Sequence, residues 1–305
     1  MSDKYKFNYN YFNVIDNEEK AYWLGFLYAD GYNNRKKRTI SLSLAEEDLE
    51  HLYLFSKCID VNKTIYLSNK NNKCENCQNI NRLDITNENF SQKLVELGCF
   101  QAKTFILKFP TQKQVPKNLI RHFIRGYFDG DGSVWFTLNN KRKHVRPTFS
   151  IDIVGTEQMI FAISKILKGI SVNSTIYRPH KERNNNICQL IFGGNITVQK
   201  FLDYLYKDSG IYLSRKYKKY LQLIELNRIA SQKRVKQINV NTGEIVKIWN
   251  NSHEISDYYH VHNCNLTNVL NKHKIKQNGK EYIRKTYRGY RWEYCDKETW
   301  DHIFN

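Results

Sequence analysis

Two nine-residue segments of this chain are versions of one another, and this repetition constrains the fold more than any other feature of the sequence. The first is WLGFLYADG, residues 23–31, and the second is IRGYFDGDG, residues 124–132. Each reads as an apolar helical stretch that ends in Asp followed by Gly. Small residues lie four positions apart in both. Because residues four apart share a helix face, each predicted helix carries a smooth strip that another helix can approach closely.

The two small-residue strips predict a pair of carboxylates at one end of a helix crossing. If the strips face each other, Asp30 and Asp131 meet where the two helices end. Paired carboxylates in such a place suit a hard divalent cation. An Asp at a helix C-terminus is poorly placed against the helix dipole. Two such placements therefore argue for function rather than for stability.

The similarity between the two halves continues beyond these segments. Residues 39–44 and 148–153 both alternate polar and apolar side chains, which predicts strands with one buried face. Each copy then reads helix, strand, strand, helix, strand, strand, helix. This order predicts an α+β fold whose antiparallel sheets are covered on one face. We therefore expect a first repeat over 1–110 and a second over 111–230, closed by a long basic helix over 213–229.

Several residues are expected to mark helix ends. Asp16 and Glu19 have capping-box spacing before the first motif helix. Pro116 suits the first turn of the second motif helix. Gly31 and Gly132 stand where a left-handed residue often ends a helix.

The segment 231–305 repeats nothing earlier and is expected to form a third module. Its pattern predicts a tight hairpin over 235–249, two short helices over 252–260 and 264–272, and a final strand over 287–294. Two short helices joined by a brief turn are a helix-turn-helix candidate. The alternative for their exposed polar residues is simple capping and solvation.

Charge and composition narrow the partners and the compartment. The formal net charge is +18, which favours binding to a polyanion; an AT-rich genome that over-uses Lys and Asn is the plain alternative. The sequence contains no run of 18 apolar residues, so we expect no membrane-spanning helix. The first residues show no signal-peptide pattern, and the seven cysteines are an odd number. We therefore expect reduced thiols and a cytoplasmic location.

At the two repeated segments the chain resembles a LAGLIDADG homing endonuclease of the single-chain, two-motif kind. The resemblance extends over roughly residues 16–230, and PKNLIRHFIRGYFDGDG, residues 116–132, closely matches the second motif region. The tail resembles the modular helix-turn-helix repeat at the ends of intron-encoded nucleases, through Thr242-Gly243-Glu244, the helix pair and residues 289–292. This resemblance implies a pseudo-twofold duplicated αββαββα fold with saddle-shaped antiparallel sheets.

The resemblance also implies an activity. It predicts a monomeric, Mg²⁺-dependent endonuclease, encoded by a phage, bacterium or organelle and used at the nucleoid. The enzyme would hydrolyse phosphodiester bonds on both strands of a long double-stranded DNA target. An intron RNA-splicing maturase on the same fold, which binds intron RNA, is one alternative. A catalytically decayed DNA-binding regulator is another, although both motif aspartates are intact.

The family's catalytic positions carry over to this chain residue by residue. The metal ligands would be Asp30 and Asp131. The family also uses a basic residue near each scissile phosphate, and this role falls to Lys103 and Lys216, with Lys108 and Lys113 as rivals for the first. One motif position is often Asp in the family. The second repeat keeps it as Asp129 and the first has Tyr28 instead, a departure that affects helix capping rather than metal binding.

Polar faces of the predicted strands, a basic hairpin tip and the second tail helix provide the predicted DNA contacts. A two-stranded ribbon fits the major groove, where Arg, Gln and Asp read base edges; the alternative is an ordinary solvated sheet face. The predicted DNA-contacting residues are Arg38, Thr39, Ser41, Ser43, Lys141, Arg142, Arg146, Thr148, Ser150, Asp152, Arg178, Gln189, Asn265, Asn268 and Lys272.

Overall fold

The computed structural model describes residues 6–295, except 63, 69–78, 138–146, 179–185, 232 and 278–279. The chain divides after Leu221 into two compact units. The first, which we call the repeat unit, contains both repeats. The second, the tail unit, begins at Gln222. Within the described ranges, every helix is too short or too polar to cross a membrane.

Both repeats have the predicted order of elements, so the α+β fold class is confirmed. The first repeat comprises α1 Glu18–Ala29, β1 Gly31–Asn34, β2 Thr39–Ala45, α2 Leu49–Cys58, β3 Tyr66–Ser68, β4 Ile80–Thr86 and α3 Glu88–Glu96. The second comprises α4 Ile120–Asp131, β5 Gly132–Thr137, β6 Thr148–Thr156, α5 Glu157–Gly169, β7 Thr175–Tyr177, β8 Ile187–Gly193 and α6 Asn195–Tyr206.

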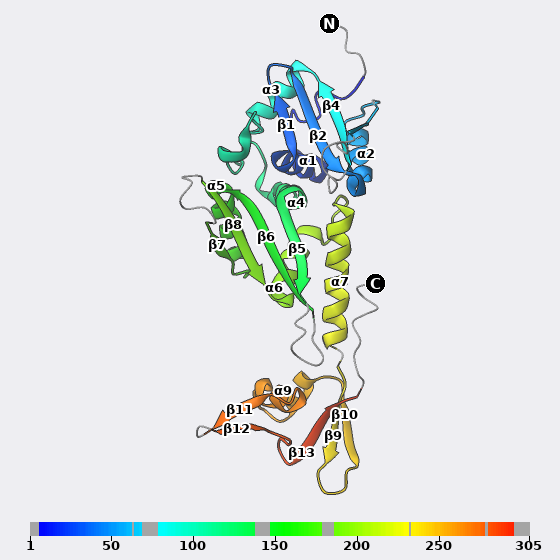
Figure 1. Ribbon diagram of the computed structural model, residues 1–305, viewed down its shortest axis with the longest axis vertical. Helices are drawn as coiled ribbons and strands as arrows, with labels where there is room; N and C mark the ends of the chain where they lie inside the picture. The colour runs from blue at the N-terminus through cyan, green and yellow to red at the C-terminus, as the bar shows by residue number, and fades with distance from the viewer. Residues whose placement is uncertain are drawn as a thin grey trace. The chain divides into compact units, whose positions relative to one another are not determined.

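The two four-stranded sheets have the same topology and the same register. Their strand orders are β1-β2-β4-β3 and β5-β6-β8-β7, with antiparallel pairing throughout. Gly31 pairs with Leu42 in the first sheet, and Gly132 pairs with Ile153 in the second. In each repeat, helices pack on one face of the sheet (Figure 1). Alternate strand residues, such as Ile151 in β6, are buried against those helices.

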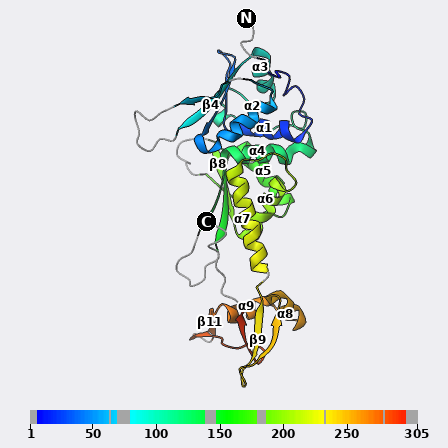
Figure 2. The same ribbon diagram turned by 90° about the vertical axis from the view of Figure 1, so that its right-hand side faces the viewer.

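Helices α1 and α4 cross at close range between the two sheets, as the small-residue strips predicted (Figure 2). A Cβ atom added at Gly25 would lie 2.0 Å from the carbonyl oxygen of Phe123. One added at Gly126 would lie 1.9 Å from the carbonyl oxygen of Tyr22. Only a residue without a side chain lets the two backbones touch in this way.

The start of the first motif helix differs in detail from the prediction. Asn17, rather than Asp16, is the N-cap of α1, and its side-chain oxygen accepts from the backbone N–H of Lys20 at 2.9 Å. Asp16 instead forms an ion pair with the Lys20 side chain at 2.9 Å. Pro116 precedes a short 3₁₀ turn, Lys117–Leu119, and α4 begins only at Ile120.

The predicted left-handed conformation of Gly31 and Gly132 is wrong. Both residues begin strands directly after the motif helices, and Gly132 has φ −91°. Their lack of a side chain is needed for space instead. A Cβ atom at Gly31 would lie 2.6 Å from the carbonyl oxygen of Leu27, and one at Gly132 would lie 2.1 Å from the Phe128 ring.

Helix α7, Ser214–Ser231, follows the second repeat where the basic helix was expected. The tail unit then contains β9 Val235–Asn239, β10 Ile245–Trp249, α8 Ser252–Tyr258, α9 Asn263–Leu270, β11 Lys274–Gln277, β12 Lys280–Ile283 and β13 Tyr290–Tyr294. The three-stranded sheet β10-β9-β13 and the two helices enclose a small core around Trp249 and Trp292. The β11–β12 hairpin was not predicted from the sequence.

Candidate functional site

The two motif aspartates lie at the same end of the crossing helices. Asp30 caps the C-terminus of α1 and Asp131 is the last residue of α4. A Cβ atom on Gly130 would lie 3.0 Å from Oδ2 of Asp30, so the carboxylate of one repeat reaches the backbone of the other. Both aspartates keep access to solvent. Asp30 and Asp131, which occupy equivalent positions in the two repeats, therefore also lie close together in space.

The electrostatics of the two carboxylates are coupled. Burial and the neighbouring charge of Asp30 raise the pKa of Asp131 to about 6. Burial also raises the pKa of Asp30, while Lys216, Lys103 and Arg215 act to lower it. Each carboxylate disfavours the ionised form of the other, so a cation placed between them would stabilise both negative charges.

The donor set suits a hard divalent cation. Among the described residues, no group of three or more His, Cys, Asp or Glu side chains is placed to hold a metal. A cation at Asp30 and Asp131 would therefore complete its shell with other oxygens. Mg²⁺ is commonly bound in this way, through one or two carboxylates together with water and phosphate oxygens.

Two lysines approach the aspartates in equivalent positions of the two repeats. Lys103 donates from Nζ to the carbonyl oxygen of Gly31, directly after Asp30. Lys216 donates to the carbonyl oxygen of Gly132, directly after Asp131. Both ammonium charges act to lower the pKa of both aspartates. The rival lysines at 108 and 113 are exposed.

The environments of the two lysines differ. Lys216 is only 2% exposed and also donates to the carbonyl oxygens of Phe128 at 2.6 Å and Asp129 at 2.8 Å. Burial lowers the pKa of Lys216 to about 8, against the raising effect of the nearby carboxylates. Lys103 is half-buried at a short 3₁₀ turn, Lys103–Phe105.

The variable motif position ties each motif helix to the end of its repeat. Asp129 is fully buried and accepts from the Tyr206 hydroxyl at 2.5 Å and from the Leu213 backbone N–H at 2.8 Å. In the first repeat, the Tyr28 hydroxyl donates to the carbonyl oxygen of Leu97 at the end of α3. The two residues thus hold corresponding segments with different chemistry.

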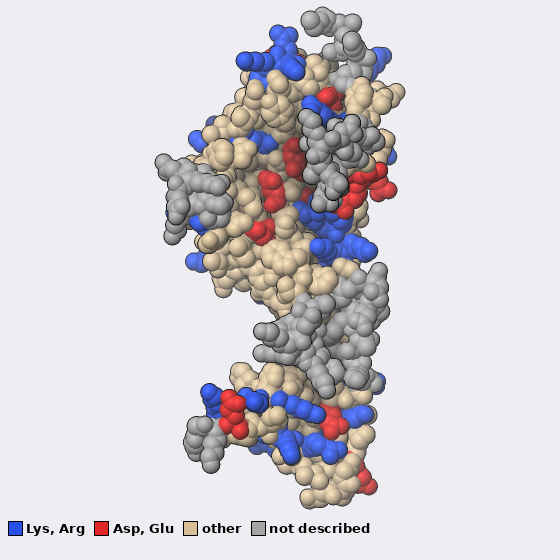
Figure 3. All heavy atoms as spheres, viewed as in Figure 1, with Lys and Arg blue, Asp and Glu red and all other residues tan. Residues whose placement is uncertain are grey.

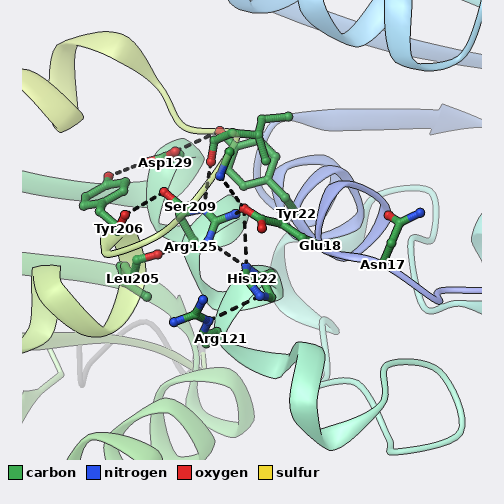
Figure 4. A network of polar contacts seen from close by, with 12 residues as sticks. Asn17, Glu18, Tyr22, Arg121, His122, Arg125, Asp129, Leu205, Tyr206 and Ser209 are labelled. Atoms are coloured by element: carbon green, nitrogen blue, oxygen red, sulfur yellow. Dashed lines mark hydrogen bonds and ion pairs between the residues drawn. The ribbon is translucent and has the colours of Figure 1, made fainter.

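A buried polar network around Arg125 links the repeats (Figure 4). The Arg125 guanidinium donates to Glu18 Oε1 at 2.6 Å, to the Ile211 carbonyl oxygen at 2.8 Å and to the Leu205 carbonyl oxygen at 3.0 Å. Its side chain is completely buried and lies over the Tyr22 ring, 5.3 Å from the centroid. Because Glu18 begins α1 and Arg125 lies in α4, this ion pair fixes the crossing of the motif helices.

A second buried chain of polar groups crosses the same boundary. The Tyr22 hydroxyl donates to Asp129 Oδ2 at 2.8 Å and lies 2.8 Å from Nε2 of His51 in α2. Burial lowers the pKa of His51 to about 3, so its ring is neutral. A neutral ring with a proton on Nε2 donates to the Tyr22 oxygen and satisfies the chain.

In the first repeat, the predicted DNA-contacting residues lie on the sheet face opposite the helices or at its edge. Ser41 Oγ donates to Asp84 Oδ1 at 2.6 Å and accepts from Arg82 at 2.9 Å. Thr39 bonds the hydroxyl of Thr86 at 2.9 Å. Ser43 is exposed. Arg38 is exposed too, but its guanidinium pairs with Glu88 at 2.7 Å.

In the second repeat, the corresponding sheet face is less charged. Thr148 is exposed, whereas Ser150 and Asp152 are half-buried. Gln189 donates to Asp152 Oδ2 at 3.3 Å. Arg178 forms an exposed ion pair with Glu157. The structure thus places these residues on one face or at its margin, except for three basic residues, Lys141, Arg142 and Arg146, that lie outside the described residues.

In the tail, Asn265 is exposed on α9, and Asn268 lies 3.2 Å from Nδ1 of His273. Lys272 does not belong to this helix, because α9 ends at Leu270 and Lys272 has a left-handed backbone with φ 52°. The predicted helix was therefore two residues too long. Non-glycine residues in this conformation typically end a helix rather than continue it.

Sequence reasoning missed two arginines. Arg82 occupies the position in β4 that Gln189 occupies in β8, since they pair with Tyr66 and Tyr177 respectively. Aligning the two repeats could have identified Arg82, because Gln189 at the equivalent position was predicted to contact DNA. Arg215 directly precedes Lys216, and its Nε lies 3.0 Å from Oδ2 of Asp48. The sequence contains no pattern that connects residues 48 and 215.

Comparisons with known proteins show what this chain is similar to. Residues 118–206 match the family model of a LAGLIDADG-like domain. A protein of Methanocaldococcus jannaschii described as replication factor C small subunit is 22% identical over 218 residues, which are 71% of this chain but only 11% of that protein.

Solved structures are also similar. Meganuclease I-SmaMI bound to uncleavable DNA is 13% identical with a TM-score of 0.45, covering 68% of this chain and 90% of that one. The I-LtrWI homing endonuclease bound to target DNA is 13% identical with a TM-score of 0.46, covering 73% and 91%.

Proposed function

We propose that this protein, whose residues 118–206 match the family model of a LAGLIDADG-like domain, is a site-specific DNA endonuclease that cuts both strands of a double-stranded target. The observation that carries the proposal is the coupled pair Asp30 and Asp131 at the end of the α1–α4 crossing. A lysine contacts the backbone beside each of them. One composite site made by two repeats suits a monomer acting on two strands.

The roles of the residues follow from their chemistry. Asp30 and Asp131 would hold Mg²⁺, which, when bound, activates water and stabilises charge on the phosphate. The charges of Lys103 and Lys216 favour the ionised form of these carboxylates, because they act to lower the carboxyl pKa values against the effect of burial. Their bonds to Gly31 and Gly132 also hold the backbone after each aspartate in place. On these grounds we assign all four residues to the active site.

The open faces of the two sheets would bind the DNA. They present hydroxyl, amide and guanidinium groups. The guanidinium of Arg82 is fixed in orientation by its neighbours. Its guanidinium is held by Asp84 at 2.7 Å and by Ser41 at 2.9 Å. A guanidinium held along one edge keeps donors for the bidentate contact to guanine that arginine makes in the major groove.

The tail unit would add affinity rather than chemistry. Its helices α8 and α9 pack together, and Asn265 on α9 is exposed. A tethered second module raises apparent affinity through effective concentration. We propose that it binds the same DNA outside the cleavage site.

The decisive experiment measures cleavage and binding separately in aspartate variants. The duplex is selected by the wild-type protein from a random-sequence library. Asp30→Asn and Asp131→Asn should each lower cleavage by about 10²-fold or more, as loss of a transition-state contact does, while binding persists. Asp60→Asn is the matched control, because Asp60 is exposed and has a left-handed backbone that Asn tolerates. EDTA should leave binding and remove cutting, and added Mg²⁺ should restore it.

The outcomes separate the alternatives. Full activity in either aspartate variant would refute the assignment of the site. Binding to the duplex without any cleavage by the wild-type protein would favour a DNA-binding regulator. Preferential binding to structured intron RNA would favour a maturase.

A further inference from the structure

Lys216 has no donor left for DNA. An ammonium group has three N–H donors, and the three carbonyl oxygens of Phe128, Asp129 and Gly132 accept all of them. The side chain is also buried. A phosphate could reach Lys216 only if the backbone around Asp131 lost these bonds. The geometry therefore makes Lys216 a residue that positions the end of α4.

Arg215, the residue before it, is the opposite case. Its side chain is 45% exposed, and it is held by Asp48, which is almost buried. Nε lies 3.1 Å and 3.0 Å from the two carboxylate oxygens of Asp48. In the described part of the chain, the contacts of this guanidinium all run through Nε. The four N–H donors of its terminal nitrogens remain for a ligand.

Arg215 is close enough to Asp30 for its charge to act to lower the pKa of that carboxyl group. It also acts to lower the pKa of its neighbour Lys216. In Figure 3, Lys and Arg atoms gather over the first turns of α7, next to a group of Asp and Glu atoms. A guanidinium that is tethered at one edge and open at the other is suited to bind a phosphate in a bidentate way.

In the first repeat, the position equivalent to Arg215 is not an arginine. If Lys103 corresponds to Lys216, the position before it is Ala102, which has no charge. In the described structure, Lys103 donates to Gly31 alone, so it keeps two N–H donors. The accessible cation beside the aspartates is therefore a lysine in one half of the molecule and an arginine in the other.

We propose that Arg215 is the residue that contacts the DNA phosphate at the cut in one strand, that Lys103 serves the other strand, and that Lys216 is a positioning residue. This proposal rests on the proposed endonuclease function. It predicts that the two halves of the site respond differently to loss of their accessible cation. Asp48 would orient Arg215 and neutralise its charge until the phosphate arrives.

The test is a strand-resolved cleavage assay on the full-length protein. A supercoiled plasmid carries a duplex selected by the wild-type protein from a random-sequence library, and the cut in each strand is followed separately. Arg215→Gln should slow one strand by at least about tenfold relative to the other, so that nicked plasmid accumulates. Arg215→Lys should recover part of the loss, because it keeps the charge but not the fork.

Three further variants separate contact from folding. Lys218→Gln removes an exposed charge from the same helix and should behave as wild type. Asp48→Asn breaks the ion pair but keeps the arginine, so it should lower the melting temperature and change the strand ratio less than Arg215→Gln does. Lys216→Met should lower the melting temperature without changing the salt dependence of binding.

A binding measurement keeps the proposal testable apart from cleavage. Arg215→Gln should reduce the slope of log affinity against log salt by about one, as loss of a single phosphate contact does. Equal slowing of both strands with an unchanged salt slope would overturn the proposal. So would identical behaviour of Arg215→Gln and Asp48→Asn. If the wild-type protein binds but does not cut, the endonuclease function fails while the slope still decides the role of Arg215; absence of binding refutes both.

Discussion

Of the described glycines, Gly126 leaves the least space for a side chain, so a single methyl group at the helix crossing should be costly. Gly126→Ala would place its Cβ atom 1.9 Å from the Tyr22 carbonyl oxygen, whereas real Cβ atoms essentially never come within 3.0 Å of such an atom. Helices α1 and α4 would therefore have to separate by about 1 Å (3.0 − 1.9). Because backbone atoms are involved, no rotamer change can relieve the clash.

The magnitude follows from two costs and one gain. Overpacking of a well-packed core costs about 1–3 kcal/mol. A gap of about 0.5–1 Å forfeits about a quarter to a half of the dispersion energy of each contact that opens. Alanine regains about 1 kcal/mol because it favours the helix over glycine. The net loss in the free energy of unfolding is about 1–2 kcal/mol, which lowers the melting temperature by about 2–8 °C in a domain of this size.

The assay is calorimetry with urea unfolding on the full-length protein. Gly169→Ala is the control, because a Cβ atom at this last residue of α5 has no heavy atom within 4 Å; its stability should stay equal or rise slightly. Gly25→Ala should resemble Gly126→Ala. The double variant should lose less than the sum, since one separation of the helices relieves both clashes. A melting temperature for Gly126→Ala equal to that of Gly169→Ala would refute the close crossing.

Three other predictions concern the buried network, the pH dependence and the tail. Asp129→Asn should cost about 3 kcal/mol or more in urea unfolding, because it disturbs a buried, multiply bonded charge, and Tyr22→Phe should cost only about 1 kcal/mol; equal losses would argue against the network. Because the pKa of Asp131 is raised from 3.8 to about 6 in the folded state, protonation stabilises the fold, so the metal-free protein should lose stability as the pH rises through this window. The thermal shift caused by Mg²⁺ should grow over the same range and lose this dependence in Asp131→Asn; a pH-independent shift would contradict it. A protein ending at Ala230 should cut at the same phosphates but bind more weakly and with a shallower salt slope, in gel-shift titrations at two salt concentrations; unchanged affinity would remove the DNA-binding role of the tail.

The repeat determined most of the architecture before any coordinates. Two copies of an apolar helix ending in Asp-Gly, each followed by alternating strands, were enough to predict the element order and the face-to-face glycines at 25 and 126. Hydrophobic periodicity is a local property of the sequence, and a duplicated chain shows the same periodicity in both copies. The pairing of Asp30 with Asp131 followed because residues at equivalent ends of two crossing helices must meet.

Tertiary structure alone decided what the neighbouring residues do. The conformations of Gly31 and Gly132 were mispredicted because the space beside a backbone, rather than its φ, selects glycine there. Arg215 keeps N–H donors for a ligand because Asp48 engages only its Nε. Lys216 has none left, because three carbonyl oxygens at the end of α4 and the start of β5 accept all of its N–H donors. Burial and long-range hydrogen bonds join residues more than 80 positions apart, and a local sequence pattern contains no information about such distances.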